Sequence, residues 1–274
     1  MTNKRKSGKV APVVRGLLFV AYGVPIIWIV ITSLKTSGQV FNTGWGMIFF
    51  SPNITAYTKN LHGALLQAGL QSIIIATGTC VLVLLIAVPA GYGLARTTGR
   101  IPTIALGALI ILQMVPQTAT VIPLFQVFGS WGLLDNTLGV VIADTALLTP
   151  FAVLLLRPFF RGVPIALEES GAIDGASVWR IFRSIVLPIA RNGVATTATL
   201  IFLISWGEFL YAVNFFLSPG RYPLSAVLAQ QITAFGIDWP GLMALAVITS
   251  IPILVLFVAT YKQLRDGLTL GAVK

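Results

Sequence analysis

The chain has 274 residues, of which 56% are hydrophobic and only 9% are charged, and it carries a formal net charge of +10. Soluble globular domains contain about 25% charged residues, so the composition excludes a soluble domain and predicts a membrane protein. The single cysteine, Cys80, excludes a disulfide and a cysteine-based metal site, and the single histidine, His62, is expected in a solvated loop.

Six segments are long and apolar enough to cross a bilayer, which takes about 20 residues. They lie at residues 14–34, 68–94, 103–128, 138–159, 192–217 and 240–261. The first follows a basic N-terminus, but it has no small-residue cleavage site, so it predicts a spanning helix rather than a signal peptide. The sequence therefore predicts an all-α membrane protein with six transmembrane helices in a single domain, residues 1–274.

The basic residues indicate which way the chain crosses the membrane. If the N-terminus is cytoplasmic, 15 of the 18 Lys and Arg residues fall in cytoplasmic segments, and the others, Lys35, Lys59 and Arg221, fall outside. Cytoplasmic segments are enriched in Lys and Arg, so both termini are expected in the cytoplasm. This placement also accounts for the net charge without a nucleic-acid partner. External loops are expected at 35–67 and 218–239.

A cytoplasmic loop at 164–191 is the longest polar, charge-dense interval in the chain. A short helix is predicted from Pro164 to Ile173, because proline suits the first turn of a helix. Glu168 and Glu169 complement the positive end of its dipole. Asp174-Gly175 then predicts a turn.

A second helix of this loop is predicted from Ser177. It has one apolar face, formed by Val178, Ile181, Phe182, Ile185 and Val186. Helices shorter than about 12 residues are marginal alone in water. The helical pair is therefore expected to dock against another surface.

Five residues of the loop stand at the spacing of a known signature: Glu169, Gly175, Ile185, Leu187 and Pro188. They fit E-A-A-x3-G-x9-I-x-L-P, so the loop resembles that of the integral-membrane subunits of binding-protein-dependent ABC importers. The sequence D-G-A-S at 174–177 is similar to the sugar-importing branch, in particular the second permease of maltose-type systems. Ser170 and Gly171 stand where the signature has two alanines, and both remain small.

The resemblance implies a type I importer permease fold and gives this loop a role. In the family it is the coupling helix, which sits in a groove of a cytoplasmic ATPase and transmits its closing motion. The residues that would couple to the ATPase are Glu169, Ser170, Gly171, Asp174, Gly175, Ala176, Leu187 and Pro188. The alternative is an ordinary amphipathic loop at the membrane surface, because any polytopic protein can have one long cytoplasmic loop.

The third predicted span contains two prolines, Pro116 and Pro123, seven residues apart. Each proline removes a helix hydrogen bond and bends the chain. In lipid, freed carbonyl groups are tolerated only against protein or a water-filled cavity, so this helix is expected to face the solute path. The span also resembles the family motif M-x-P-x-x-A-x-x-I-P-L, matched at Met114, Pro116, Ala119, Ile122, Pro123 and Leu124.

Two acidic residues fall inside predicted spans, Asp144 in the fourth and Glu208 in the fifth. Carboxylates at bilayer depth usually face a cavity or a partner group, and aromatic rings beside a hydrogen-bonding acceptor suit a sugar. The residues predicted along the translocation path are Pro116, Gln117, Pro123, Trp206, Glu208, Tyr211 and Asn214. The alternative is that both acids pair structurally with a partner subunit. The family shows W-N-x-F at 206–209, and this chain has Gly207 in place of the asparagine.

The C-terminal residues 267–274 match the family tail G-L-T-x-G-A-V-K. In maltose-type importers this tail approaches the ATPase pair. The resemblance therefore implies an ATPase contact at Thr269, Gly271 and Lys274.

The sequence has no G-x4-G-K-[ST] phosphate loop, so this chain is predicted to bind no cofactor and to leave ATP and Mg²⁺ to partner subunits. The resemblance implies a second, related permease that forms a heterodimer with this one, with a homodimer as the alternative. It also implies two ATPase subunits, an extracytoplasmic solute-binding protein and a sugar, in a prokaryotic cell membrane. One alternative hypothesis is an ion- or proton-driven carrier that uses Asp144 and Glu208. Another is a membrane enzyme, but no residues in the sequence support it.

Overall fold

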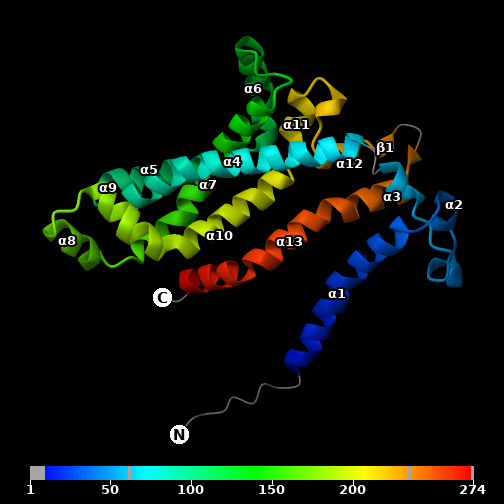
Figure 1. Ribbon diagram of the computed structural model, residues 1–274, viewed down its shortest axis with the longest axis horizontal. Coiled ribbons are helices and arrows are strands. Elements are labelled where there is room, and N and C mark those ends of the chain that lie inside the picture. Colours follow the sequence, from blue (N-terminus) through cyan, green and yellow to red (C-terminus); the bar gives the residue numbers. More distant parts are fainter. Residues whose placement is uncertain (1–9, 61–62, 234–235, 273–274) are drawn as a thin grey trace, which may run out of the picture. The chain divides into compact units, whose positions relative to one another are not determined.

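The computed structural model describes residues 10–60, 63–233 and 236–272 (Figure 1). The described residues form two compact units. The first contains the chain up to Leu65 together with Leu228–Ile251, and the second contains Leu66–Val227 together with the chain from Pro252 onward.

The first unit contains a long apolar helix and several short elements: α1 (Val10–Ser33), α2 (Ser37–Val40), η1 (Gly44–Met47), α3 (Thr55–Asn60), β1 (Ile232–Thr233) and β2 (Gly236–Ile237). Thr36 and Gln39 exchange side-chain bonds with each other's backbone N–H groups at the start of α2, which satisfies two donors that a helix leaves free. The strands β1 and β2 pair antiparallel, with Ile232 opposite Ile237.

The second unit is a bundle of long helices with shorter ones at its ends. Its elements are α4 (Gly63–Arg96), α5 (Arg100–Gln113), α6 (Gln117–Trp131), α7 (Thr137–Arg161), α8 (Ile165–Ile173), α9 (Val178–Ile181), the π-helical turn η2 (Phe182–Val186), α10 (Leu187–Trp206), α11 (Leu210–Phe215), η3 (Pro219–Arg221) and α12 (Leu224–Ala229). Three helices cross the boundary: residues 63–65 of α4, 228–229 of α12 and 239–251 of α13 (Trp239–Ala272) belong to the first unit, and the remainder of each belongs to the second.

Helix α7 holds this bundle together, because it packs against α5, α10 and α11. One apolar cluster joins α4, α7 and α10 through buried side chains such as Val83, Leu156 and Ile201, and it continues into the α8–α10 loop. The approach of α10 to α7 is very close at Gly193, where a Cβ atom would lie 2.2 Å from the Phe159 ring. Figure 1 shows α8 and α9 together at one end of this bundle.

The helices confirm the predicted spans. Five helices of the described residues are long and apolar enough to cross a membrane, and there are six spans if the bent pair α5–α6 is counted as one. The third span was expected as a kinked helix. It is instead broken, since α5 and α6 meet at 91° and Pro116 stands just before α6, where its missing N–H costs no hydrogen bond.

The fifth span differs from its predicted limits of 192–217. A continuous helical segment begins at Val178, passes through η2 and ends at Trp206, and α11 then begins separately at Leu210. The helix starts early because Pro188, which has no N–H, lies in the first turn of α10 after a widened π-turn. It ends early because the residues around Glu208 form the start of the next helix.

Candidate coupling loop and solute path

The loop at 164–191 folds as predicted into two helices joined by a tight turn. Pro164 precedes α8, and Gly175 takes a positive φ of 78° after its last turn. The N–H of Gly175 bonds to the Ala172 carbonyl and the N–H of Ala176 bonds to the Gly171 carbonyl, both at 3.0 Å. This is the Schellman arrangement that ends a helix, and it favours glycine at the left-handed position.

The second helix of the loop begins at Ser177, whose side chain accepts from the Arg180 N–H at 3.4 Å. Ile181, Phe182 and Val186 are buried as predicted. The assignment of Val178 to that buried face was wrong, because it is 73% exposed. Val178 borders an apolar hollow of about 340 Å³ formed with Pro89, Tyr92, Trp179 and Phe182, rather than the packed core.

The predicted coupling residues fall into an exposed group and a packed group. Glu169, Ser170, Asp174, Gly175 and Pro188 are exposed, Ala176 and Leu187 are half-buried, and Gly171 is buried. A Cβ atom at Gly171 would lie 2.9 Å from Ile185 Cδ1 and 3.3 Å from Ile181 Cγ1, so this position packs α8 onto the second helix. The exposed group is the part of the loop that is free to contact another protein.

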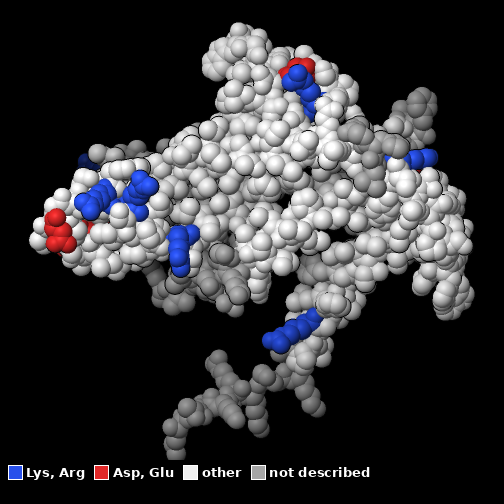
Figure 2. All heavy atoms as spheres, viewed as in Figure 1, with Lys and Arg blue, Asp and Glu red and all other residues white. Residues whose placement is uncertain are grey.

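Charged side chains gather at the same end of the second unit. Figure 2 shows Lys and Arg together with Asp and Glu over the α8–α10 region. The exposed arginines of this region are Arg161, Arg180, Arg183 and Arg191. Such a mixed, polar surface suits a contact with a soluble partner better than a contact with lipid.

One group of residues in this region was not assigned a contact from the sequence. Glu168 accepts hydrogen bonds from Tyr92 and Arg96 of α4, and Arg96 also donates to the Val163 carbonyl. From the sequence, Glu168 was expected only to complement the dipole of its helix. The sequence showed a Tyr and an Arg four residues apart at the end of one span and two adjacent glutamates in the later loop. Their pairing depends on how the helices pack.

Glu208 is buried between α6 and α11. Its carboxylate accepts from the Tyr211 N–H at 2.5 Å and the Ala212 N–H at 3.4 Å, at the start of α11. Gln117 of α6 donates to its other oxygen at 2.9 Å. The carboxylate therefore caps a helix N-terminus, where a negative charge is stabilised, and joins it to the broken third span.

The other residues predicted along the path lie around this group. The Tyr211 hydroxyl is 2.7 Å from that of Thr120, Trp206 is buried and stacked on Phe202, and the Asn214 amide donates to the Leu210 carbonyl at 2.7 Å. Pro123 and Tyr211 line a mostly apolar hollow of about 340 Å³ between α5, α6 and α7. Pro116 is exposed and Gln117 is half-buried.

Asp144 is buried in α7 and accepts a hydrogen bond from the Ser205 hydroxyl of α10. Both acidic residues of the spans thus have hydrogen-bond donors within this chain.

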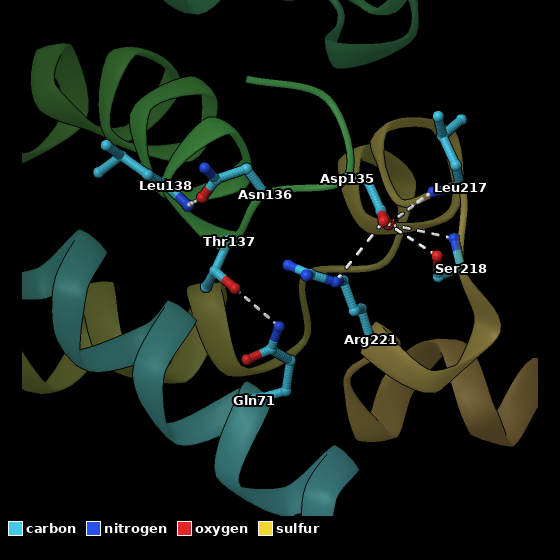
Figure 3. Close-up of polar contacts among 8 residues, drawn as sticks. All are labelled: Gln71, Asp135, Asn136, Thr137, Leu138, Leu217, Ser218 and Arg221. Atoms are coloured by element: carbon cyan, nitrogen blue, oxygen red, sulfur yellow. Dashed lines mark hydrogen bonds and ion pairs between the residues drawn. The ribbon is translucent and has the colours of Figure 1, made fainter. Parts of the chain in front are cut away.

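One side chain fastens the α6–α7 connection to the segment after α11 (Figure 3). Asp135 accepts from the N–H groups of Leu217 and Ser218 at 3.0 and 3.1 Å and from the Ser218 hydroxyl at 2.9 Å, and it lies 3.6 Å from Arg221. Desolvation raises the pKa of Asp135. The hydrogen bonds from Ser218 and Leu217 and the charge of Arg221 together lower this pKa by more than desolvation raises it, so the pKa lies below its usual value.

The start of α7 is fixed by the two residues that follow (Figure 3). Asn136 accepts from the Leu138 N–H at 2.9 Å, which caps the helix. Gln71 of α4 donates to the Thr137 hydroxyl at 2.7 Å. These contacts join α4, α7 and the segment after α11 at one end of the bundle.

The predicted contacts of the C-terminal tail lie outside the described residues. Thr269 and Gly271 belong to the backbone of α13, without described side chains, and Lys274 is not described. His62 also lies outside the described residues.

Residues 83–269 match the family described as the binding-protein-dependent transport system inner membrane component. The chain belongs to this family. It is therefore the inner-membrane permease component of an ABC importer.

Curated relatives of this permease cover between 77% and 98% of the chain. The putative ABC transporter permease protein ORF1 of Streptomyces antibioticus is 34% identical over 77% of this chain and 92% of its own length. The sulfoquinovosyl glycerol transport system permease protein SmoH of Agrobacterium fabrum is 28% identical over 98% of this chain and 95% of its own. The trehalose transport system permease protein SugB of Mycobacterium tuberculosis is 29% identical, with 94% coverage of each chain.

The fold of the permease is also found in solved structures. A chain of a bacterial ABC transporter that imports the acidic polysaccharide alginate superimposes with a TM-score of 0.79, at 21% identity, over 96% of this chain and 99% of that one. A chain of the MetNI methionine transporter superimposes with a TM-score of 0.57 over 72% of this chain. These matches confirm the predicted importer permease fold.

Proposed function

We propose that this permease forms half of the translocation pathway for a sugar or sugar-like solute, and that the 164–191 loop couples it to a cytoplasmic ATPase. The observation that carries the proposal is the loop itself. It is a closed helical pair with a packed inner side and an exposed signature that includes Glu169, Asp174 and Gly175. The names of relatives such as SmoH and SugB support a sugar as the solute.

The chain would work by alternating access. ATP binding would close two ATPase subunits, the α8–α9 pair would move with them, and the broken helices would open the path to a loaded solute-binding protein. ATP and Mg²⁺ would stay on the ATPase subunits, because this sequence has no phosphate loop. Thr269, Gly271 and Lys274 are proposed as a second contact with the ATPase pair.

The solute path is proposed to run beside the break between α5 and α6. Prolines interrupt the helix there, and Gln117, Glu208 and Tyr211 bring polar groups to a region otherwise lined by apolar side chains. In many transporters, broken helices form the solute site near the midplane of the membrane. Because Glu208 accepts hydrogen bonds from three donors, its proposed role is to shape the path and to orient Gln117. Trp206 and Asn214 are proposed to form part of the wall of the path.

A second permease, related to this one, is proposed to complete the pathway. Large apolar side chains of the α5–α6 region are exposed, among them Met114 at 77%, Ile122 at 71% and Trp131 at 67%. Some of this surface faces lipid, and some is proposed to pack on the second permease. A heterodimer is proposed, as in maltose-type systems.

Uptake by the complete complex tests the proposal. Proteoliposomes with this permease, its partner permease, the ATPase and the binding protein are supplied with a panel of radiolabelled mono- and disaccharides. We expect uptake of at least one sugar that requires both ATP and the binding protein. Deletion of 169–175 should abolish this uptake while the amount of permease in the membrane stays unchanged.

The same vesicles distinguish the proposal from the carrier hypothesis, which the relatives and the similar solved structures do not support. A carrier that uses Asp144 and Glu208 would take up solute with the chain alone, driven by a pH gradient without ATP. Such uptake, or normal uptake by the deletion variant, would overturn the coupling role of the loop.

A further inference from the structure

A cluster of three side chains connects the last turn of α4 to α8. Tyr92 and Arg96 are four residues apart, so they lie on the same face of α4. The Tyr92 hydroxyl donates to Glu168 Oε2 and Arg96 Nε donates to Glu168 Oε1, each at 2.7 Å. Arg96 Nη2 also forms an ion pair with Glu168, and it donates to the Val163 carbonyl, just before α8, at 2.9 Å.

The cluster is largely removed from water. The side chains of Arg96 and Glu168 are 18% and 13% exposed. Exposed ion pairs contribute little because water and salt compete for both charges. This pair is instead shielded, and the carboxylate receives donors on both oxygens, which makes the bonds charge-assisted and directional.

Tyr92 also joins the cluster to the rest of the loop. Its ring lies edge-on to Phe160 of α7, with centroids 5.9 Å apart, and 4.9 Å from the ring of Phe182 in η2. The Arg96 guanidinium lies 5.8 Å from the Tyr92 ring. One side chain of α4 therefore contacts α7, α8 and the second helix of the loop.

The two adjacent glutamates of α8 are used differently. Glu169, which belongs to the family signature, is exposed, whereas Glu168 is turned toward α4 and bonded there. Neighbouring residues on a helix point about 100° apart. One glutamate is thus available to a partner while the other holds α8 to its own subunit.

We propose that Tyr92, Arg96 and Glu168 form a clamp that makes the end of α4 and the coupling loop move as one rigid body. The three are positioning residues for energy coupling, and this inference rests on the function proposed above. Without the clamp, α8 would follow the ATPase while α4 lagged behind, so ATP would be hydrolysed with less solute transported.

The test measures ATP hydrolysis and uptake together in proteoliposomes of the complete complex, with the sugar identified in the uptake panel. Glu168→Gln keeps the shape of the side chain and removes its charge. We expect it to retain most of the ATP hydrolysis but to lower the solute transported per ATP at least about threefold, since a charge-assisted bond is roughly twice as strong as a neutral one. Glu168→Asp, which keeps the charge, should recover part of the loss, and Tyr92→Phe should show a smaller loss.

Arg100→Gln is the matched control, because Arg100 is an exposed arginine four residues further along the chain, at the start of α5. It should leave the transport ratio unchanged. A normal ratio in Glu168→Gln, or an equal loss in Arg100→Gln, would overturn the clamp.

A distance measurement tests the rigid body without any sugar. Spin labels are placed at Thr97 and Ile173, both exposed, in the complete complex with and without ATP. We expect one narrow distance distribution that ATP leaves unchanged, and a broader distribution in Glu168→Gln. An equally narrow distribution in that variant would refute the clamp. If the unmodified complex took up no sugar with ATP, the proposed function would fail. The spin-label distances would still show whether the clamp holds α8 and the end of α4 together.

Discussion

Glycine residues of this permease differ in the space available for a side chain. At Gly193 a Cβ atom would lie 2.2 Å from the Phe159 ring, whereas at Gly107 of α5 a Cβ atom would meet nothing within 4 Å beyond its own helix backbone. Both glycines lie inside helices, where alanine is favoured by about 1 kcal/mol. The same substitution is therefore expected to have opposite effects at the two positions.

Gly193→Ala should destabilise the permease, because the Phe159 ring must move and separate α10 from α7. Overpacking of this kind costs about 1–3 kcal/mol. Thermal unfolding of the purified chain in detergent should give a lower Tm for Gly193→Ala, and an equal or higher Tm for Gly107→Ala. An unchanged Tm for the first variant would show that α7 and α10 are not so close.

Asp135 should make stability depend on pH. Its pKa is below the usual value when folded, so its contribution is complete above the unfolded pKa of about 3.9 and is lost as the pH falls through the folded pKa. Asp135→Asn removes the charge, and asparagine tolerates the positive φ of 52°. Between neutral pH and pH 3, the wild-type Tm should fall more than that of the variant. Parallel curves would contradict the assignment.

At the scale of the element, the broken helices depend on one buried cap. The N-terminus of α11 has free N–H groups that need an acceptor, and Glu208 supplies it while accepting from Gln117 of α6. The carboxylate therefore joins the start of α11 to the start of α6, the second half of the broken third span. It determines where the fifth span stops.

Glu208→Ala should leave those N–H groups and the Gln117 amide without an acceptor. Loss of a helix cap costs about 0.5–2 kcal/mol, and the unpaired Gln117 adds to this. We expect a lower Tm and reduced uptake. Glu208→Gln, which retains an oxygen for the Tyr211 N–H, should lose less. If both variants matched the wild type in Tm, the cap would not be needed.

The π-turn η2 shows how an element can depend on a single residue in the sequence. Pro188 would clash with a regular helical turn before it, and the widened turn at 182–186 lets the helix continue. The coupling loop therefore runs directly into the spanning helix α10. No non-helical residue separates the second helix of the loop from α10.

At the scale of the whole molecule, the number of spans and the charge pattern predict that both termini and the coupling loop are cytoplasmic. Single cysteines at Ser51 and Ile173, in a Cys80→Ser background, test this orientation. A membrane-impermeant thiol reagent should label the first in intact spheroplasts and the second only after the membrane is opened. Labelling of Ile173→Cys in intact spheroplasts would reverse the topology.

The sequence by itself determined the six apolar segments, the loop at 164–191 and the turn at Gly175, because these depend on local hydropathy and local backbone conformation. Only the tertiary structure decided the partners of Glu168, Glu208 and Asp135, the break in the third span and the limits of the fifth. Arg96 and Glu168, for example, are 72 residues apart. Such contacts depend on how helices pack against one another, which a pattern along one helix does not encode. The same limit explains why Val178 was assigned to the apolar face of its helix but is 73% exposed.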